Sequence, residues 1–254
     1  MRLRVLGAYG AVDATHNLTG YLIDDRIAVD AGTLTSKLTL VQQARIESIF
    51  VTHAHADHIR DLPHLIVNRF NQNAAPLNII ASAEVMDRLV NYVFNGEVWP
   101  DFEKIVAPET GRPAIQYRAV APGKKIRIGT TEFTVVPVHH SVPAAGVIVE
   151  VDGQSIAFTG DTGPTEQFWK RTNKFENLVG IITEASFPND FQTLATESGH
   201  LTPQLFEKEL PKIQRDIPVY ASHRKIPYDK KIESEVKNIR DRRARVLVEK
   251  QYTL

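Results

Sequence analysis

Three histidines and an aspartate stand within six residues of the sequence, directly after the apolar run Ile49–Val51. They are His53, His55, Asp57 and His58, and they include a third of the nine histidines in the chain. Packing of a strand or helix does not require such a cluster, whereas imidazole and carboxylate groups are common ligands of zinc, manganese and iron. A polar loop that is rich in histidine by chance is the alternative. The spacing therefore predicts a metal site.

Other apolar runs end in the same kinds of side chain. The run "FTVVPV" leads to His139 and His140, "SIAFTG" leads to Asp161, and "VPVYAS" leads to His223. Because active-site side chains lie on loops at one end of a rigid sheet, we expect these strand ends to converge. Alternate residues of the first cluster can then serve two neighbouring ions, about 3.5–4 Å apart in known two-metal sites. Unlike imidazole, a carboxylate can bridge two ions, and Asp161 is the candidate.

The rest of the chain predicts a layered α/β fold. Helical patterns cover 62–70, Glu84–Phe94, Pro203–Leu210 and 229–243, and Asp61 is a candidate N-cap for the first of them. Strands and helices alternate, which is typical of sheets covered by helices. Twelve short β-rich runs are expected to be strands: Leu3–Leu6, Gly20–Ile23, Arg26–Val29, Ser48–Val51, Leu77–Ala81, Lys125–Ile128, Glu132–Pro137, Gly146–Val151, Ser155–Phe158, Leu178–Thr183, Val219–Ala221 and Arg245–Val248.

Composition excludes several kinds of protein. The 254 residues are 43% hydrophobic, enough for a substantial core, and carry a formal net charge of zero. A neutral chain argues against tight non-specific binding of nucleic acid, which requires a basic field. There are no cysteines, which excludes disulfides, thiolate ligands and a cysteine nucleophile. No apolar run approaches the length of a membrane helix, and we expect a cytoplasmic protein. The oligomeric state is left open, a homodimer included.

The motif "HAHADH" at 53–58 resembles the H-x-H-x-D-H signature of the metallo-β-lactamase-fold hydrolases. "VDAG" at 29–32, ahead of this motif, and His140, "TGDTG" at 159–163 and His223 after it fall in the order that this superfamily uses. Within it, "FNGEVWPDF", "GDTGPT", "EASFPN" and "GHLTP" are similar to motifs of the class II cyclic-nucleotide phosphodiesterases. The resemblance implies one domain over 1–254, a four-layer αββα sandwich of two β-sheets flanked by helices. A helical cap is expected over about 84–118.

The resemblance also assigns roles to single residues. It implies a first ion on His53, His55 and His140, and a second on Asp57, His58 and His223. Asp161 would bridge the two ions, with a bridging hydroxide as nucleophile. Zinc is the expected metal, with manganese or iron as alternatives. His140 is preferred to His139 because Gly146 follows it by six residues, and Asp30 is expected to fix a histidine tautomer or the ligand loop. After the motif, Ile59–Leu62 lacks the glycine that the superfamily often has, which leaves the local backbone open.

Further residues are expected to act in catalysis or substrate binding. Asp57, Asp161 and His200 are the candidate catalytic residues, and His200 precedes a helix that begins at Thr202–Pro203, where an anion would be favoured. His200 would contact the phosphate or donate a proton to the leaving oxygen. Phe94 and Trp99 could stack on a base, the alternative being that they are core aromatics. His16 and His64 match no motif and are expected to be structural or solvent-facing.

The predicted function is hydrolysis of a 3′,5′-cyclic nucleotide to the 5′-monophosphate. A tRNA 3′-processing endonuclease of the same superfamily is the main alternative, and it would require a long basic arm. The segment 84–118 instead holds six acidic and four basic residues. A lactone or thioester hydrolase and a non-enzymatic binding protein are further alternatives. The intact ligand set argues against the last of these. The expected partner is a small-molecule cyclic nucleotide, with no membrane and no nucleic acid.

Overall fold

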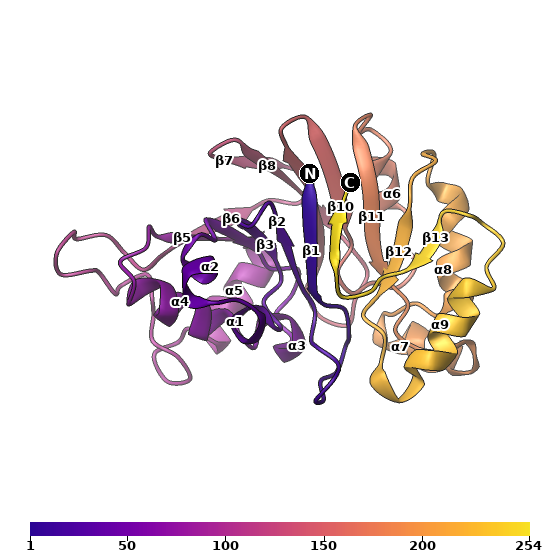
Figure 1. Ribbon diagram of the computed structural model, residues 1–254, viewed down its shortest axis with the longest axis horizontal. Coiled ribbons are helices and arrows are strands. Elements are labelled where there is room, and N and C mark those ends of the chain that lie inside the picture. Colours follow the sequence, from indigo (N-terminus) through magenta and orange to yellow (C-terminus); the bar gives the residue numbers. More distant parts are fainter.

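The computed structural model describes residues 1–254 and contains two β-sheets that face each other. Each sheet has seven strands, in the orders β14-β1-β2-β3-β4-β5-β6 and β13-β12-β11-β10-β9-β8-β7. Helices cover the outer face of each sheet, which gives the four-layer αββα arrangement (Figure 1). The two chain ends lie close together because β14 pairs with β1 in antiparallel orientation. No helix is both long and apolar enough to cross a lipid bilayer.

The first half of the chain builds one sheet, which the last strand completes. Its strands are β1 (Arg2–Gly7), β2 (Gly20–Ile23), β3 (Ile27–Val29), β4 (Ser48–Phe50), β5 (Leu77–Ser82), β6 (Ile115–Val120) and β14 (Gln251–Thr253). Strands β3 to β6 run parallel to one another. The outer face of this sheet carries α1 (Leu34–Lys37), α2 (Leu40–Ala44), α3 (Ala56–Ile59), α4 (Leu62–Phe70) and α5 (Ala83–Tyr92).

The second half builds the other sheet. Its strands are β7 (Lys125–Ile128), β8 (Thr131–Pro137), β9 (Ala145–Val151), β10 (Gln154–Phe158), β11 (Leu178–Glu184), β12 (Val219–Ser222) and β13 (Ala244–Val246). Strands β10 to β13 are parallel. The helices of this half are α6 (Gln167–Thr172), α7 (Gln192–Ser198), α8 (Pro203–Glu209) and α9 (Asp229–Lys237), with short 3₁₀ turns at η1 (Asn189–Phe191), η2 (Leu210–Lys212) and η3 (Ile226–Tyr228).

Three hydrophobic clusters hold the four layers together. One lies between the two sheets, and the other two lie between each sheet and its helices. Alternation along a strand explains the division, because successive side chains point to opposite faces. In β4, Ile49 packs under the helices while Phe50 packs between the sheets, and both are fully buried. Each sheet is therefore apolar on both faces, and polar side chains collect at the strand ends.

All twelve predicted strands are present, and the two hairpin turns at 24–25 and 152–153 have the positive φ values that tight turns require. Asp24 and Asp25 between β2 and β3 have φ of 48° and 58°, and Asp152 and Gly153 between β9 and β10 have φ of 48° and 77°. Two strands were not predicted. β6 alternates polar and apolar residues at partly exposed positions, and β14 is only three residues long. Neither has the apolar run that identified the others.

The predicted helical cap over 84–118 is wrong for most of its length. Only α5 is helical there, the chain from Val93 to Ala114 is irregular, and β6 then joins the first sheet. The irregular part is fixed by burial of aromatic side chains: Phe94 and Phe102 belong to the core beneath the first sheet. The predicted helix over 229–243 ends earlier, at Lys237.

The chain after the histidine motif needs no glycine, because it stays helical. Arg60 and Asp61 both have right-handed helical backbone angles between α3 and α4. Asp61 does not cap α4 with its side chain, contrary to the prediction. Its buried carboxylate instead accepts hydrogen bonds from the backbone N–H groups of Thr35 (2.8 Å) and Ser36 (3.4 Å). Asp61 thereby ties the motif to α1, the helix that follows Asp30.

We predict that Asp61→Ala lowers the free energy of unfolding by about 1–3 kcal/mol, because it leaves two backbone donors without their acceptor. Urea denaturation followed by circular dichroism measures the change. The matched control is Asp190→Ala, which removes an ion pair with Lys231 from an aspartate whose side chain is 69% exposed. It should change stability by less than about 1 kcal/mol. Equal losses in the two variants would contradict the assigned role.

Candidate metal centre

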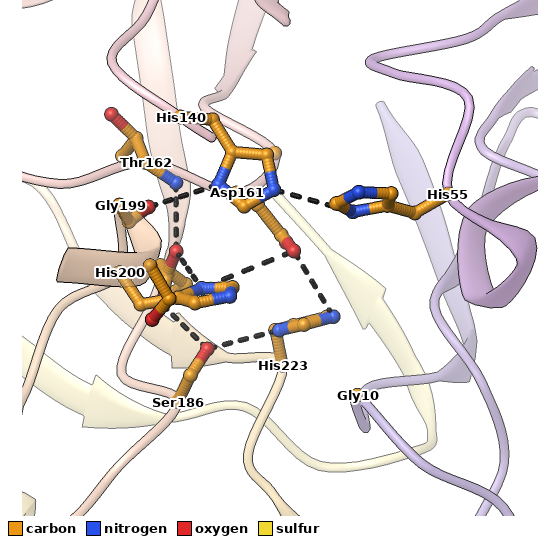
Figure 2. Close-up of polar contacts among 12 residues, drawn as sticks. Gly10, His55, His140, Asp161, Thr162, Ser186, Gly199, His200 and His223 are labelled. Carbon is orange, nitrogen blue, oxygen red and sulfur yellow. Dashed lines mark hydrogen bonds and ion pairs between the residues drawn. The ribbon is translucent and has the colours of Figure 1, made fainter. Parts of the chain in front are cut away.

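The predicted ligands come together at one end of the two sheets. His53 and His55 follow β4, Asp57 and His58 lie in α3, His140 follows β8, Asp161 follows β10, and His223 follows β12. Figure 2 shows His55 reaching from the first half of the chain toward His140 and Asp161 of the second half. The polar residues at the ends of strands from both sheets therefore lie close together at one edge of the sandwich.

Four of these side chains form a first group of possible ligands. The donor atoms of His53, His55, His140 and Asp161 all lie within 4.8 Å of one another. His55 Nδ1 is 3.0 Å from His53 Nε2 and 3.3 Å from His140 Nε2. His53 Nε2 is 3.7 Å from Asp161 Oδ2. Three imidazoles and a carboxylate at this spacing are a suitable donor set for a zinc-like cation.

A second group is built around the same aspartate. It consists of Asp57, His58 and His223, whose donor atoms also lie within 4.8 Å of one another. His223 Nε2 is 3.1 Å from Asp57 Oδ2 and 3.2 Å from His58 Nε2. Asp161 faces this group as well, with Oδ1 3.3 Å from His58 Nε2 and Oδ2 3.4 Å from His223 Nε2. Asp161 therefore stands between both groups.

Asp30 fixes the orientation of two histidines on the side of the first sheet. His58 Nδ1 donates to Asp30 Oδ2 at 2.7 Å. Thr52 Oγ1 gives its only proton to the same carboxylate, at 2.9 Å, so it accepts from His53 Nδ1 at 3.1 Å. Asp30 is completely buried and has a φ of 56°, which aspartate and asparagine tolerate better than most residues. Protons are thus held on Nδ1 of both histidines, and Nε2 is left to point inward.

Glu184 has the matching role on the side of the second sheet. Ser186 Oγ donates to Glu184, so it accepts from His223 Nδ1 at 2.9 Å. His200 Nδ1 donates to Glu184 Oε1 at 2.8 Å. Outer partners of this kind set the tautomer and the ring orientation of metal-ligating histidines.

His140 receives its partner from the backbone. Its Nδ1 donates to the carbonyl of Gly199 at 3.0 Å (Figure 2). Gly199 ends α7 with a φ of 70°, and an added Cβ would lie 2.8 Å from the Cα of His140. Gly10 packs just as closely on His223, where a Cβ would lie 2.5 Å from Cε1. Both glycines allow the backbone to approach a histidine of the centre.

With a proton held on the outer nitrogen of His53, His58, His140 and His223, the inner nitrogen of each neutral ring is an acceptor. Nε2 of His58 and His223 and the oxygens of Asp57 and Asp161 lie 3.1–4.0 Å apart, so that either a second proton on an imidazole or a cation must lie between them. Asp161 Oδ1 is buried and has no hydrogen-bond donor. Buried acceptors that face one another are unfavourable unless a cation lies between them. The residues present therefore fit a metal ion, and the clusters can bind one.

Burial and the neighbouring charges shift the pKa values of the side chains at this place in different directions. Burial raises the pKa of Asp161, but the His223 and His58 imidazoles outweigh it and hold the value well below the ordinary range. Burial lowers the pKa of His58, yet Asp161 and Asp30 raise it well above its ordinary value. Burial and the neighbouring imidazoles keep the pKa of His53 well below the usual value, so that its lone pair is free. Burial also lowers the pKa of His55.

His200 lies in the centre, although it was predicted without a metal role. Its ring stacks on His223 at a centroid distance of 5.7 Å and stands edge-on to His140 at 4.9 Å. Its Nδ1 is 4.0 Å from Asp161 Oδ2. Burial lowers the pKa of His200, but Glu184 more than compensates, and the value is raised. This geometry favours a proton on the imidazole of His200.

The remaining histidines lie away from the centre, as expected. His139 is exposed, which agrees with the preference for His140. His64 is exposed on α4 and packs edge-on against Trp99. His16 lies in the loop after β1 and pairs with Asp13.

The two aromatic residues proposed to stack on a base do not line the centre. Phe94 is only 1% exposed and packs against Phe102 and Tyr117, so its faces are covered by the core. Trp99 lies against His64 and Phe102 and is partly buried on the same cluster. The proposed stacking role is therefore not supported for Phe94, and Trp99 packs as a core aromatic.

Three supporting residues were not assigned from the sequence: Thr52, Glu184 and Ser186. Glu184 is the last residue of β11, and the rule that polar residues end buried strands would have identified it. Thr52 and Ser186 act through one hydroxyl each; Ser186 lies with Glu184 in the motif "EASFPN", whereas Thr52 belongs to none of the quoted motifs.

The two facing sheets and the histidine and aspartate cluster at their ends define a metallo-β-lactamase fold. The family model described as "Beta-lactamase superfamily domain" matches residues 25–223, and the chain belongs to this family of metal-dependent hydrolases. The matched range contains every predicted metal ligand, from His53 to His223.

Similar proteins include two phosphodiesterases and several ribonucleases. The chain is 30% identical over 218 residues to a "Probable 3′,5′-cyclic-nucleotide phosphodiesterase" of Yersinia pestis, covering 76% of this chain and 61% of that protein. It is 27% identical to a "3′,5′-cyclic-nucleotide phosphodiesterase" of Aliivibrio fischeri, covering 97% and 84%. It is also 28% identical to "Ribonuclease Z" of Natronomonas pharaonis, covering 80% of each chain. Both activities therefore occur among relatives.

Solved structures support the fold. Yeast PDE1 superposes with a TM-score of 0.80 at 17% identity, covering 100% of this chain and 99% of that chain. The Bacillus subtilis metallo-β-lactamase fold protein YhfI gives 0.78 at 18% identity, covering 99% and 98%. The predicted fold class is thus confirmed.

We predict that Asp30→Asn weakens zinc binding about 10–100-fold, the usual effect of removing an outer partner of a ligand. The asparagine tolerates the positive φ but cannot accept from Thr52 and His58 with a full negative charge. Competition with a chromophoric chelator measures the affinity. Asp25→Asn, at a surface ion pair with Arg2 and Arg4, is the control and should leave zinc affinity unchanged. Unchanged affinity in Asp30→Asn would show that Asp30 has no role in orienting ligands.

Proposed function

We propose that this protein is a binuclear metal-dependent phosphodiesterase that hydrolyses a 3′,5′-cyclic nucleotide to the 5′-monophosphate. The observation that supports it most is the position of Asp161 between two groups of inward-facing acceptors. Two metal ions on either side of one carboxylate suit displacement at phosphorus. The relatives named as cyclic-nucleotide phosphodiesterases support the choice of substrate.

The two groups would each hold one divalent ion, with zinc as the first choice because imidazole and carboxylate donors suit it. His53, His55 and His140 would hold one ion, Asp57, His58 and His223 the other, and Asp161 would contact both. When bound, such ions supply Lewis acidity and lower the pKa of water.

The chain itself then supplies proton transfer and orientation. Asp57 is the most exposed of the ligand carboxylates, with 24% of its side chain accessible, and it can accept the proton of the attacking water. The water oxygen forms the new bond to phosphorus, and the bond from phosphorus to the 3′ oxygen breaks. His200, held by Glu184, donates a proton to that leaving oxygen. The phosphate monoester remains on the 5′ carbon.

Processing of tRNA is the second candidate, because ribonuclease Z proteins are among the relatives. The charge distribution argues against it here. Residues 84–118 carry six acidic and four basic side chains, and the whole chain has no net charge, which gives no field for an RNA backbone. A lactone or thioester hydrolase would use the same ligands, and only turnover can distinguish it.

The proposal predicts a clear order of substrates for the zinc-loaded protein. Cyclic 3′,5′-AMP or 3′,5′-GMP should be hydrolysed to the 5′-monophosphate, and faster than a 2′,3′-cyclic nucleotide, a precursor tRNA or a lactone. Chelation followed by dialysis should remove the activity, and zinc should restore it. Product analysis by liquid chromatography measures the outcome. Cleavage of the precursor tRNA alone would instead identify a ribonuclease.

Asp161→Ala should abolish this hydrolysis, because it removes the one side chain that faces both groups. Metal analysis should also show fewer ions bound per chain than in the wild type. Asp216→Ala, at an aspartate whose side chain is 65% exposed, is the control and should retain full activity. Undiminished hydrolysis in Asp161→Ala would rule out the bridging role.

His200→Gln should lower kcat for a cyclic nucleotide about 10²–10⁴-fold, the usual contribution of a general acid. The loss should be much smaller for bis(p-nitrophenyl) phosphate, because p-nitrophenolate leaves without protonation. Stopped assays on both substrates measure the ratio. His64→Gln, at the exposed histidine on α4, is the control. Equal losses on both substrates would assign His200 to substrate binding or structure and not to proton donation.

A further inference from the structure

A cavity of about 420 Å³ opens beside the first group of ligands and has no role in the chemistry above. It is bordered by the loop after β4, the end of α5 and the loop after β8. The residues that line it are Ala54, His55, Arg88, Tyr92, Val93, Ser141, Val142 and Pro143. Because His55 belongs both to this cavity and to the candidate metal centre, a group bound here would be continuous with a phosphate bound there.

One wall of the cavity is an aromatic ring that the core does not cover. Tyr92 lines the cavity and is 62% exposed. Arg88 lies one helical turn earlier on α5, with its guanidinium carbon 5.5 Å from the centroid of the Tyr92 ring. Arg88 Nη1 donates to Tyr92 Oη at 3.3 Å, which orients the two side chains together.

The chemistry of the lining identifies the kind of group that it would accept. Val93, Val142 and Pro143 are apolar, Arg88 supplies hydrogen-bond donors, and none of the lining residues is acidic. A flat heteroaromatic ring with acceptor atoms at its edge satisfies all three features, because it can stack on tyrosine and accept from a guanidinium. A second phosphate would use Arg88 but would gain nothing from the tyrosine and the apolar wall.

We infer that this cavity is the base subsite of the enzyme, with Tyr92 as the stacking platform and Arg88 as the donor to the edge of the base. The inference rests on the proposed function, since it assigns the part of a nucleotide that lies beyond the phosphate. It replaces Phe94, which is buried, and Trp99, which packs against the core cluster, by Tyr92, two positions before Phe94, whose side chain is exposed.

The test compares two ligands that share a phosphate and a sugar but differ in the base. On the zinc-loaded protein, adenosine 5′-monophosphate should bind more tightly than ribose 5-phosphate, as measured by isothermal titration calorimetry. Tyr92→Ala should weaken binding of adenosine 5′-monophosphate about 5–100-fold, the range expected for loss of one stacking contact. Binding of ribose 5-phosphate should not change.

Two further variants separate stacking from other effects. Tyr92→Phe keeps the ring and should retain most of the preference for adenosine 5′-monophosphate. Val106→Ala, at an exposed residue outside the cavity, should behave as the wild type. The inference is overturned if the wild type does not prefer the ligand with a base, or if Tyr92→Ala weakens both ligands equally or neither.

These outcomes are independent of the reaction. Suppose that the wild type does not hydrolyse cyclic nucleotides but prefers adenosine 5′-monophosphate to ribose 5-phosphate, and that Tyr92→Ala removes this preference. The proposed function then fails and the base subsite remains. Suppose instead that the wild type and Tyr92→Ala hydrolyse cyclic nucleotides with the same kcat/KM and bind adenosine 5′-monophosphate equally well. The base subsite then fails and the proposed function remains.

Discussion

The arrangement of the site depends on one electrostatic constraint: the inner atoms of the neutral histidines and of the aspartates are acceptors, and only added positive charge makes their close approach favourable. The outer nitrogens of four of the five ligand histidines are held by other partners. Asp30 and Thr52 hold His58 and His53, Ser186 holds His223, and the Gly199 carbonyl holds His140. The inner atoms then have only lone pairs to offer, and a cation is the species that makes such a cluster favourable.

This constraint explains why the two sheets end as they do. Apart from the ligands, each sheet provides one buried carboxylate at the site, Asp30 after β3 and Glu184 at the end of β11, and each of the two accepts from one histidine directly and from one hydroxyl. The same hydroxyl in each case accepts from a second histidine. The central strands can pack apolar side chains on both faces because these polar side chains are confined to the strand ends.

The sequence contained most of the fold and of the ligand set, for a physical reason. Buried strands on both sides of a sheet require continuous apolar runs, and a ligand cluster requires rare residue types, so both are visible without a structure. The direction in which a side chain points, by contrast, cannot be predicted from residue type and spacing alone. The helical spacing placed Asp61 before α4, but only the folded chain brings its carboxylate to the N–H groups of α1. Phe94 and Tyr92 are two residues apart, yet one is buried and the other is exposed.

Both ligand groups draw on both halves of the chain, and this links the site to the stability of the fold. His53 and His55 meet His140, and Asp57 and His58 meet His223, across the boundary between the two sheets. A cation bound by either group is therefore held by segments that separate on unfolding. Ligands that bind only the folded state stabilise it by mass action. The arrangement of ligands that would bind the catalytic cation would therefore also make cation binding stabilise the packing of the two halves of the sandwich against each other.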